Sequence, residues 1–205
     1  LNHQWDQTPS VAIADDSSNE SWAMLSVVDN PGGGGVTARE LELGRWSGNM
    51  GYLNLSGVTW NAADHFFTIG MAGEGYVSVN SGTVDYRYGW LGYEASSQGS
   101  LELWSSQWNL GLDQDLIVGR QGYGTMMLDG ASQSRCGRLV LGELYGGRGE
   151  LHLRDSSSIM VTNPMVVAYN GAEATVEVGD YSTLEVSGRG AGDPEDVVGM
   201  ALVQN

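Results

Sequence analysis

The chain has 205 residues, 31 of them glycine and four proline, and a formal net charge of −16 from 25 acidic residues against nine arginines and no lysine. An acidic surface repels nucleic acid phosphates and anionic lipid headgroups, which argues against both as partners. No apolar run reaches 18 residues, so the sequence predicts no membrane insertion. The single cysteine, Cys136, has no internal disulfide partner, and we expect it to be a buried, inert thiol rather than a crosslink between chains.

A short apolar segment that ends in a small residue recurs along the chain. Its copies end at Gly44, Gly70, Gly92, Gly119 and Gly142, and a weaker sixth copy, residues 166–169, ends at Tyr169. Successive copies are therefore 26, 22, 27, 23 and 27 residues apart. Repeats of 20 to 50 residues are typical of solenoids, propellers and other repeat arrays.

A second small residue follows each copy, after seven or five residues in alternation. It is Gly51, Gly75, Gly99, Gly124, Gly149 and, more weakly, Ala174. Alternating apolar residues come next, such as Leu53 and Leu55, and a period of two is the period of a β-strand. No window shows helical spacing over ten residues. Each unit thus has two short strands and a stretch rich in Ser, Gly and Asn.

These units predict an all-β parallel β-helix, or β-solenoid, because one strand pair cannot bury its apolar face without a stacked neighbour. We expect about seven coils of 22–27 residues in a two-coil repeat that alternates long and short units. A propeller blade needs four strands, and the double period of 48 to 50 residues allows one, but its two halves are too alike. Leu53, Leu101 and Leu151 should then share one inward column with Val77, Met126 and Val176.

The expected domain organisation is simple. Residues 1–40 are interpreted as an amino-terminal cap or irregular first coil, and residues 41–205 as solenoid repeats. Residues 11–14 resemble a repeat anchor of that first coil. The carboxyl end, residues 200–205, stops in mid-coil, so either more chain or another molecule should complete the stack.

Two segments carry a family resemblance. Residues 57–61 followed by residues 67–79, with Phe-Thr-Ile-Gly-Met-Ala-Gly-Glu-Gly-Tyr-Val-Ser-Val, and residues 118–128 resemble the autotransporter-associated repeat. That repeat occurs in type V secretion passengers and in proteins with PEP-CTERM sorting signals. The resemblance covers about residues 41–186 and implies a secreted or cell-surface β-solenoid. It implies no activity.

No residue set predicts catalysis, a cofactor or a metal. Asp113 and Asp115 supply too few oxygen ligands for calcium. Glu102 and His152 should point outward two coils apart with Met127 between them, too far to share a proton.

The two related tryptophans, Trp60 and Trp108, are 48 residues apart. Two interpretations stay open for them. They form either an aromatic ladder in a coil corner or, less favoured, a sugar-stacking platform.

One outward strip predicts an interface. The position two before each anchor is polar at the start and then becomes apolar, at Trp90, Ile117, Val140, Val167 and Val197. A contiguous exposed apolar strip usually marks a contact with another chain, although a loop of the same chain could cover it.

We therefore expect an exported, non-catalytic structural β-solenoid, a matrix, surface or filament subunit that associates with itself both laterally and end to end. Two alternatives remain. One is an adhesin passenger that binds glycans or cell surfaces, and the other is a polysaccharide lyase or hydrolase on a β-helix.

Overall fold

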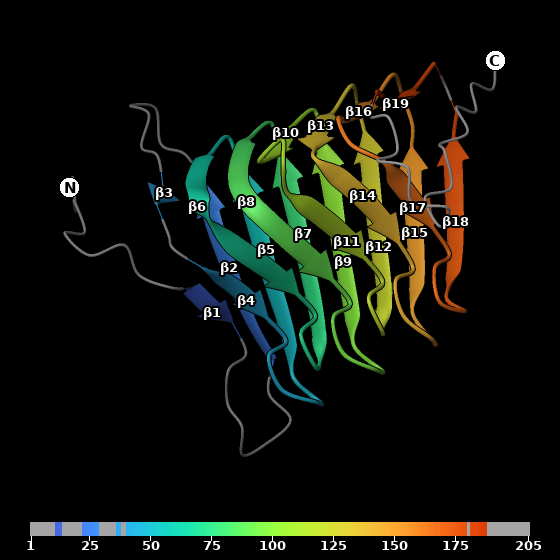
Figure 1. Cartoon of the computed structure of the whole chain (residues 1–205). Helices are drawn as coiled ribbons and strands as arrows, with labels where there is room; N and C mark the ends of the chain where they lie inside the picture. Colours follow the sequence, from blue (N-terminus) through green and yellow to red (C-terminus); the bar gives the residue numbers. More distant parts are fainter. Residues whose placement is uncertain (1–10, 14–21, 29–35, 38–39, 180, 188–205) are drawn as a thin grey trace.

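The computed structural model describes residues 11–13, 22–28, 36–37, 40–179 and 181–187. Within these ranges the chain is all β, with parallel strands stacked into a β-solenoid of about six turns and no helix. This confirms the predicted fold class. Figure 1 shows the coils side by side, from β1 and β2 at one end to β17 and β18 at the other.

One sheet holds the second strand of every coil. Its seven strands, in spatial order, are β2 (Trp22–Val28), β5 (Met50–Ser56), β7 (Glu74–Asn80), β9 (Gln98–Trp104), β12 (Tyr123–Asp129), β15 (Arg148–Leu153) and β18 (Glu173–Val178). Every neighbouring pair is parallel and in register. We call this sheet B.

Sheet A has twelve strands and covers the other side of each coil. They are β1 (Val11–Ile13), β3 (Val36–Thr37), β4 (Leu41–Leu43), β6 (Thr59–Ile69), β8 (Thr83–Leu91), β10 (Gln107–Leu110), β11 (Asp115–Val118), β13 (Gln133–Cys136), β14 (Arg138–Leu141), β16 (Ser158–Val161), β17 (Met165–Val167) and β19 (Thr183–Val186). In β6 and β8 one long strand serves both as the third segment of one coil and as the first segment of the next.

The coil therefore has three strand segments where the sequence predicted two. The stretch rich in Ser, Gly and Asn, which was not predicted to contain a strand, forms the third segment. Its residues alternate as strand residues do: Trp108 and Leu110 are buried, whereas Gln107 is exposed. The prediction was wrong here because these segments are short and most of them contain only one or two apolar residues, too few for a visible pattern.

The predicted inward column is confirmed. Leu53 pairs with Val77, and the column continues through Leu101, Met126, Leu151 and Val176. Leu53, Leu101, Met126 and Leu151 are 0% exposed. Stacked side chains about 4.8 Å apart thus fill the interior from one coil to the next.

The paired small residues of each repeat meet at the narrow corner where sheets A and B join. A Cβ atom on Gly149 would lie 2.7 Å from the backbone nitrogen of Gly142, and one on Gly99 would lie 2.5 Å from the nitrogen of Gly92. Gly92 and Gly142 also adopt φ values of +68° and +69°, which favour glycine. The repeated glycines are therefore explained by close backbone approach.

The sixth repeat copy is one residue out of register with the prediction. Val166, not Val167, pairs with Val140, and the corner residue is Ala168 with φ +55°, not Tyr169. The prediction failed because this corner has no glycine to mark it. Val167 therefore does not belong to the outward strip.

The first coil is regular where it is described. Val11 and Ile13 pair in register with Leu41 and Leu43, which confirms residues 11–13 as part of a repeat anchor, and β2 pairs with β5 over seven residues. The predicted boundary at residue 41 thus falls inside the two sheets. Residues 188–205, with the expected final coil, lie outside the described residues.

Candidate functional site

Three residues of the predicted interface strip, Trp90, Ile117 and Val140, form a column on the outer face of sheet A, and two of these three are buried. Trp90 pairs with Ile117, and Ile117 pairs with Val140. With Val166 they form a cluster separate from the main core. Ile117 is 6% exposed and Val140 2%, so the expectation of an open strip is wrong at both. These side chains pack against one another across strands, a contact that the linear pattern does not show. Val197 lies outside the described residues.

A half-buried aromatic cluster adjoins this strip. Of its residues, only Trp90 was predicted from the sequence to lie on this face. Phe66 stacks on Tyr88 with ring centroids 5.8 Å apart, and Tyr88 and Trp90 meet edge to face at 5.2 Å. Trp90 contacts Tyr93 at 5.4 Å, and the Arg120 guanidinium lies 4.4 Å from the Tyr93 ring. This cluster ties three successive coils together on their outer face.

Trp60 and Trp108 lie in the core, 1% and 0% exposed. Trp108 contacts Phe67 edge to face at 4.9 Å and stacks on Tyr86 at 5.9 Å. This confirms the corner-filling interpretation. A platform for sugars at these two residues is excluded, because neither ring reaches the surface.

Asp115 forms an ion pair with Arg138. Arg138 donates from Nε to Oδ1 at 3.1 Å and from Nη2 to Oδ2 at 2.5 Å. Among the described residues, no group of three or more His, Cys, Asp or Glu side chains is placed to hold a metal ion. Cys136 is buried beside this pair, and burial, with a smaller effect of Asp115, raises the pKa of its thiol to about 12.

Glu102 and His152 are separated as predicted, with Met127 between them in the same column. His152 instead contacts two other carboxylates. Its Nδ1 lies 2.8 Å from Oε2 of Glu177 in the next coil, and its Nε2 lies 3.4 Å from Oε2 of Glu150 in its own strand.

Glu150 is the centre of a polar network on the outer face of sheet B. Tyr123 donates its hydroxyl proton to Oε2 at 2.7 Å, and Nη2 of Arg148 lies 2.7 Å from Oε1. Burial alone would raise the pKa of Glu150, but the hydrogen bonds from Tyr123, His152 and Arg148 outweigh it and lower that pKa. Glu150 therefore stays ionised at neutral pH.

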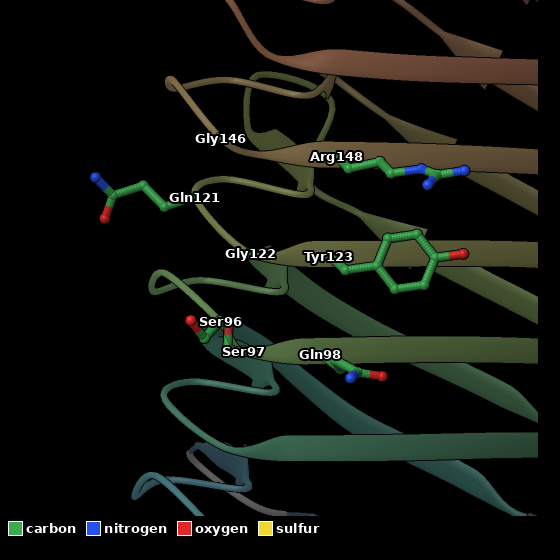
Figure 2. A pocket seen from close by; sticks show the side chains of 8 residues that line it. All are labelled: Ser96, Ser97, Gln98, Gln121, Gly122, Tyr123, Gly146 and Arg148. Atoms are coloured by element: carbon green, nitrogen blue, oxygen red, sulfur yellow. The ribbon is translucent and has the colours of Figure 1, made fainter.

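A shallow hollow of about 460 Å³ lies beside this network, where three successive turns between sheets A and B meet. Its lining is Ser96, Ser97, Gln98, Gln121, Gly122, Tyr123, Gly146 and Arg148. Figure 2 shows Gln98, Tyr123 and Arg148 on three adjacent strands, with Gln121 at the turn edge. They form one outward column, since Tyr123 pairs with both Gln98 and Arg148.

This site was not predicted from the sequence. The predicted outward column contains Glu102 and His152, whereas the hollow belongs to the outward column four residues earlier in each strand. The only available signal was the alternation of long and short turns, which brings Ser96, Gln121 and Gly146 together.

The chemistry of the hollow suits binding better than proton transfer. Acid-assisted bond cleavage needs a carboxylic acid that holds its proton near neutral pH, and Glu150 is held as a carboxylate. Glu150 borders the hollow without lining it, and the lining itself consists of two serines, two glutamines, two glycines, one tyrosine and one arginine.

Comparisons with known proteins return nothing for this chain: no family model, no curated protein and no solved structure matches it. The resemblance to the autotransporter-associated repeat therefore stays a prediction. In the part of the chain that the structure describes, no helix could span a membrane.

Proposed function

We propose that this chain is a non-catalytic structural β-solenoid that associates end to end with copies of itself, as a subunit of an extracellular layer or filament. The observation that supports association is the exposure of inward-facing residues at both described ends of sheet B. The extracellular setting draws on the repeat resemblance.

The core column is only partly covered at its two ends. Leu25 in β2 belongs to the inward column with Leu53, yet it is 38% exposed, whereas Leu53 is 0% exposed. At the other end Val176 in β18 is half-buried, whereas its neighbour Leu151 is 0% exposed. These are the positions that one more stacked coil would bury.

A second copy of the chain fits both ends. Among the described residues, β2 and β18 are the outermost strands of sheet B, and both have inward apolar residues at alternate positions. Stacking β2 of one molecule on β18 of another would bury Leu25 against Val176. Such a head-to-tail contact does not close on itself, so it generates a filament. The net charge of −16 opposes this contact at low ionic strength and is screened by salt.

Sedimentation velocity over a range of protein and salt concentrations tests the proposal. We expect larger species at high concentration, strengthened by salt. Leu25→Arg and Val176→Arg should each weaken association. Met24→Arg is the matched control, because Met24 lies on the same strand, faces outward and is 61% exposed. A monomer under all conditions, or equal effects of Leu25→Arg and Met24→Arg, would contradict the proposal.

A further inference from the structure

The hollow lies at the turns between sheets A and B and results from the alternation of short and long turns in the two-coil repeat. It is formed where a short turn, with Gln121 and Gly122, lies between two long turns that supply Ser96 and Ser97 on one side and Gly146 on the other. Gly122 allows the two turns to pack closely, since a Cβ atom there would lie 2.5 Å from the carbonyl oxygens of Glu94 and Ser97.

The floor of the hollow is held in place by the Glu150 network. The Tyr123 ring is half-buried, its hydroxyl is fixed by Glu150 at 2.7 Å, and the Arg148 guanidinium lies 5.5 Å from its ring centroid. Tyr123 thus presents a ring whose orientation is set before any ligand arrives. A preorganised ring avoids the entropy cost of ordering it on binding.

The hollow is polar and nearly neutral. Arg148 is the only charged lining residue, and Glu150 compensates its charge at 2.7 Å. Gln98 and Gln121 each offer both hydrogen-bond donors and acceptors, and Ser96 adds a hydroxyl. An apolar ligand would leave these groups unpaired, and the net charge of −16 opposes an anionic polymer.

We propose that this hollow binds a neutral polysaccharide, with one sugar ring lying on Tyr123 and its hydroxyls paired with Gln98 and Gln121. Sugar hydroxyls both donate and accept, as side-chain amides do, and the C–H face of a sugar ring packs on an aromatic ring. The hollow touches three adjacent coils, a span of about 9.6 Å, which is longer than one sugar residue and suits a chain.

A second aromatic surface lies on the same sheet, further along the solenoid axis. Tyr52 and Tyr76 stack at 5.0 Å with their planes 13° apart, both half-buried on the outer face of sheet B. Tyr76 lies in β7, two strands from Tyr123 in β12. A polysaccharide that runs along the solenoid axis would therefore pass both Tyr123 and this pair.

Affinity electrophoresis and titration calorimetry test the proposal, with xylan, β-glucan, galactomannan and dextran as neutral probes and alginate as the acidic one. We expect at least one neutral probe to bind, and its oligosaccharides to bind more tightly once they are long enough to reach both tyrosine surfaces. Alginate should not bind.

Two variants and one control locate the site. Tyr123→Ala and Gln121→Ala should weaken binding, by about threefold to tenfold for the loss of the aromatic contact. Tyr181→Ala is the matched control, because Tyr181 is 89% exposed and lies outside the hollow. Unfolding midpoints show whether each variant still folds, and Gln121→Ala changes only a turn side chain. The proposal is overturned if no neutral probe binds, if alginate binds best, or if Tyr123→Ala and Gln121→Ala bind as well as Tyr181→Ala.

Discussion

The corner between the two sheets makes a quantitative prediction for Gly99→Ala. A Cβ atom at this position would lie 2.5 Å from the nitrogen of Gly92 and 2.9 Å from the carbonyl carbon of Ile69, and closer still to the Ile69 oxygen. Gly92 donates its N–H to that same oxygen at 2.9 Å, a hydrogen bond between adjacent coils. The added methyl group would therefore sit on a backbone hydrogen bond that cannot move aside.

The expected cost follows from two contributions. Loss of the hydrogen bond between Gly92 and Ile69 costs about 0.5–1.5 kcal/mol. Forcing a methyl group into closely packed backbone costs about 1–3 kcal/mol more. We therefore expect Gly99→Ala to lower the free energy of unfolding by about 1.5–4.5 kcal/mol, although the same change inside an ordinary strand is stabilising.

Urea unfolding followed by far-UV circular dichroism measures this difference. Gly179→Ala is the matched control, since the nearest atom to its Cβ would be the Leu153 oxygen at 4.0 Å. That change should be neutral or stabilising by up to about 1 kcal/mol. If Gly99→Ala unfolds within about 0.5 kcal/mol of the unmodified chain, the close approach at the corner is not what the glycine provides.

Three further predictions use the core, the buried thiol and the Glu150 network. Trp108→Ala should cost about 3–5 kcal/mol in urea unfolding, whereas Trp104→Ala, at a ring 42% exposed, should cost under about 1 kcal/mol; equal costs would place Trp108 outside the core. Cys136, with a pKa of about 12, should react with a thiol reagent at pH 8 only as fast as the protein unfolds, and immediate labelling would contradict its burial. The pKa of Glu150 is lower in the folded chain, so its contribution to stability is complete above the unfolded value of about 4.3 and is lost as the pH falls through the folded value. Glu150→Gln should therefore reduce the loss of stability below that pH, and acid unfolding of the variant beside the unmodified chain measures the difference.

The fold could be predicted because its signals are local and repeated. The alternation of Leu53 and Leu55 and the paired glycines each recur once per coil, and both reflect constraints that the stacked coils impose on every copy. Where a copy lacks its glycine, as at Ala168, the register was misplaced by one residue and Val167 was assigned to the wrong column.

The polar residues that pack inside the solenoid could not be predicted from these local repeats. Ser106, Ser132, Ser157 and Ser182 are 0–4% exposed and line one internal corner. The hydroxyls of Ser106, Ser132 and Ser182 accept backbone N–H groups from the preceding coil, for example the Ser106 hydroxyl from Gly82 at 3.2 Å and the Ser132 hydroxyl from Ser106 at 3.1 Å. Serine is common in surface turns, so a serine in the sequence does not show that it is buried. The stretch that follows these serines was therefore not predicted to be a strand.

The candidate site could not be predicted either, for a different physical reason. In the sequence, Tyr123, Arg148 and Glu150 look like any other outward-facing strand residues. They form a site only because two strands pair in register and three turns lie side by side. Their contacts depend on turn lengths in neighbouring coils, which set which outward column borders a hollow. The burial of Ile117 and Val140 has the same origin, because it depends on neighbours across strands.

Negative-stain electron microscopy of the purified chain at raised salt and protein concentration tests the end-to-end association most directly. We expect straight rods of constant width whose lengths are multiples of one solenoid. The rods should be shorter for the Leu25→Arg variant, and they should keep their length for the Met24→Arg variant. Single solenoids at every concentration, or particles that grow in width rather than in length, would contradict it.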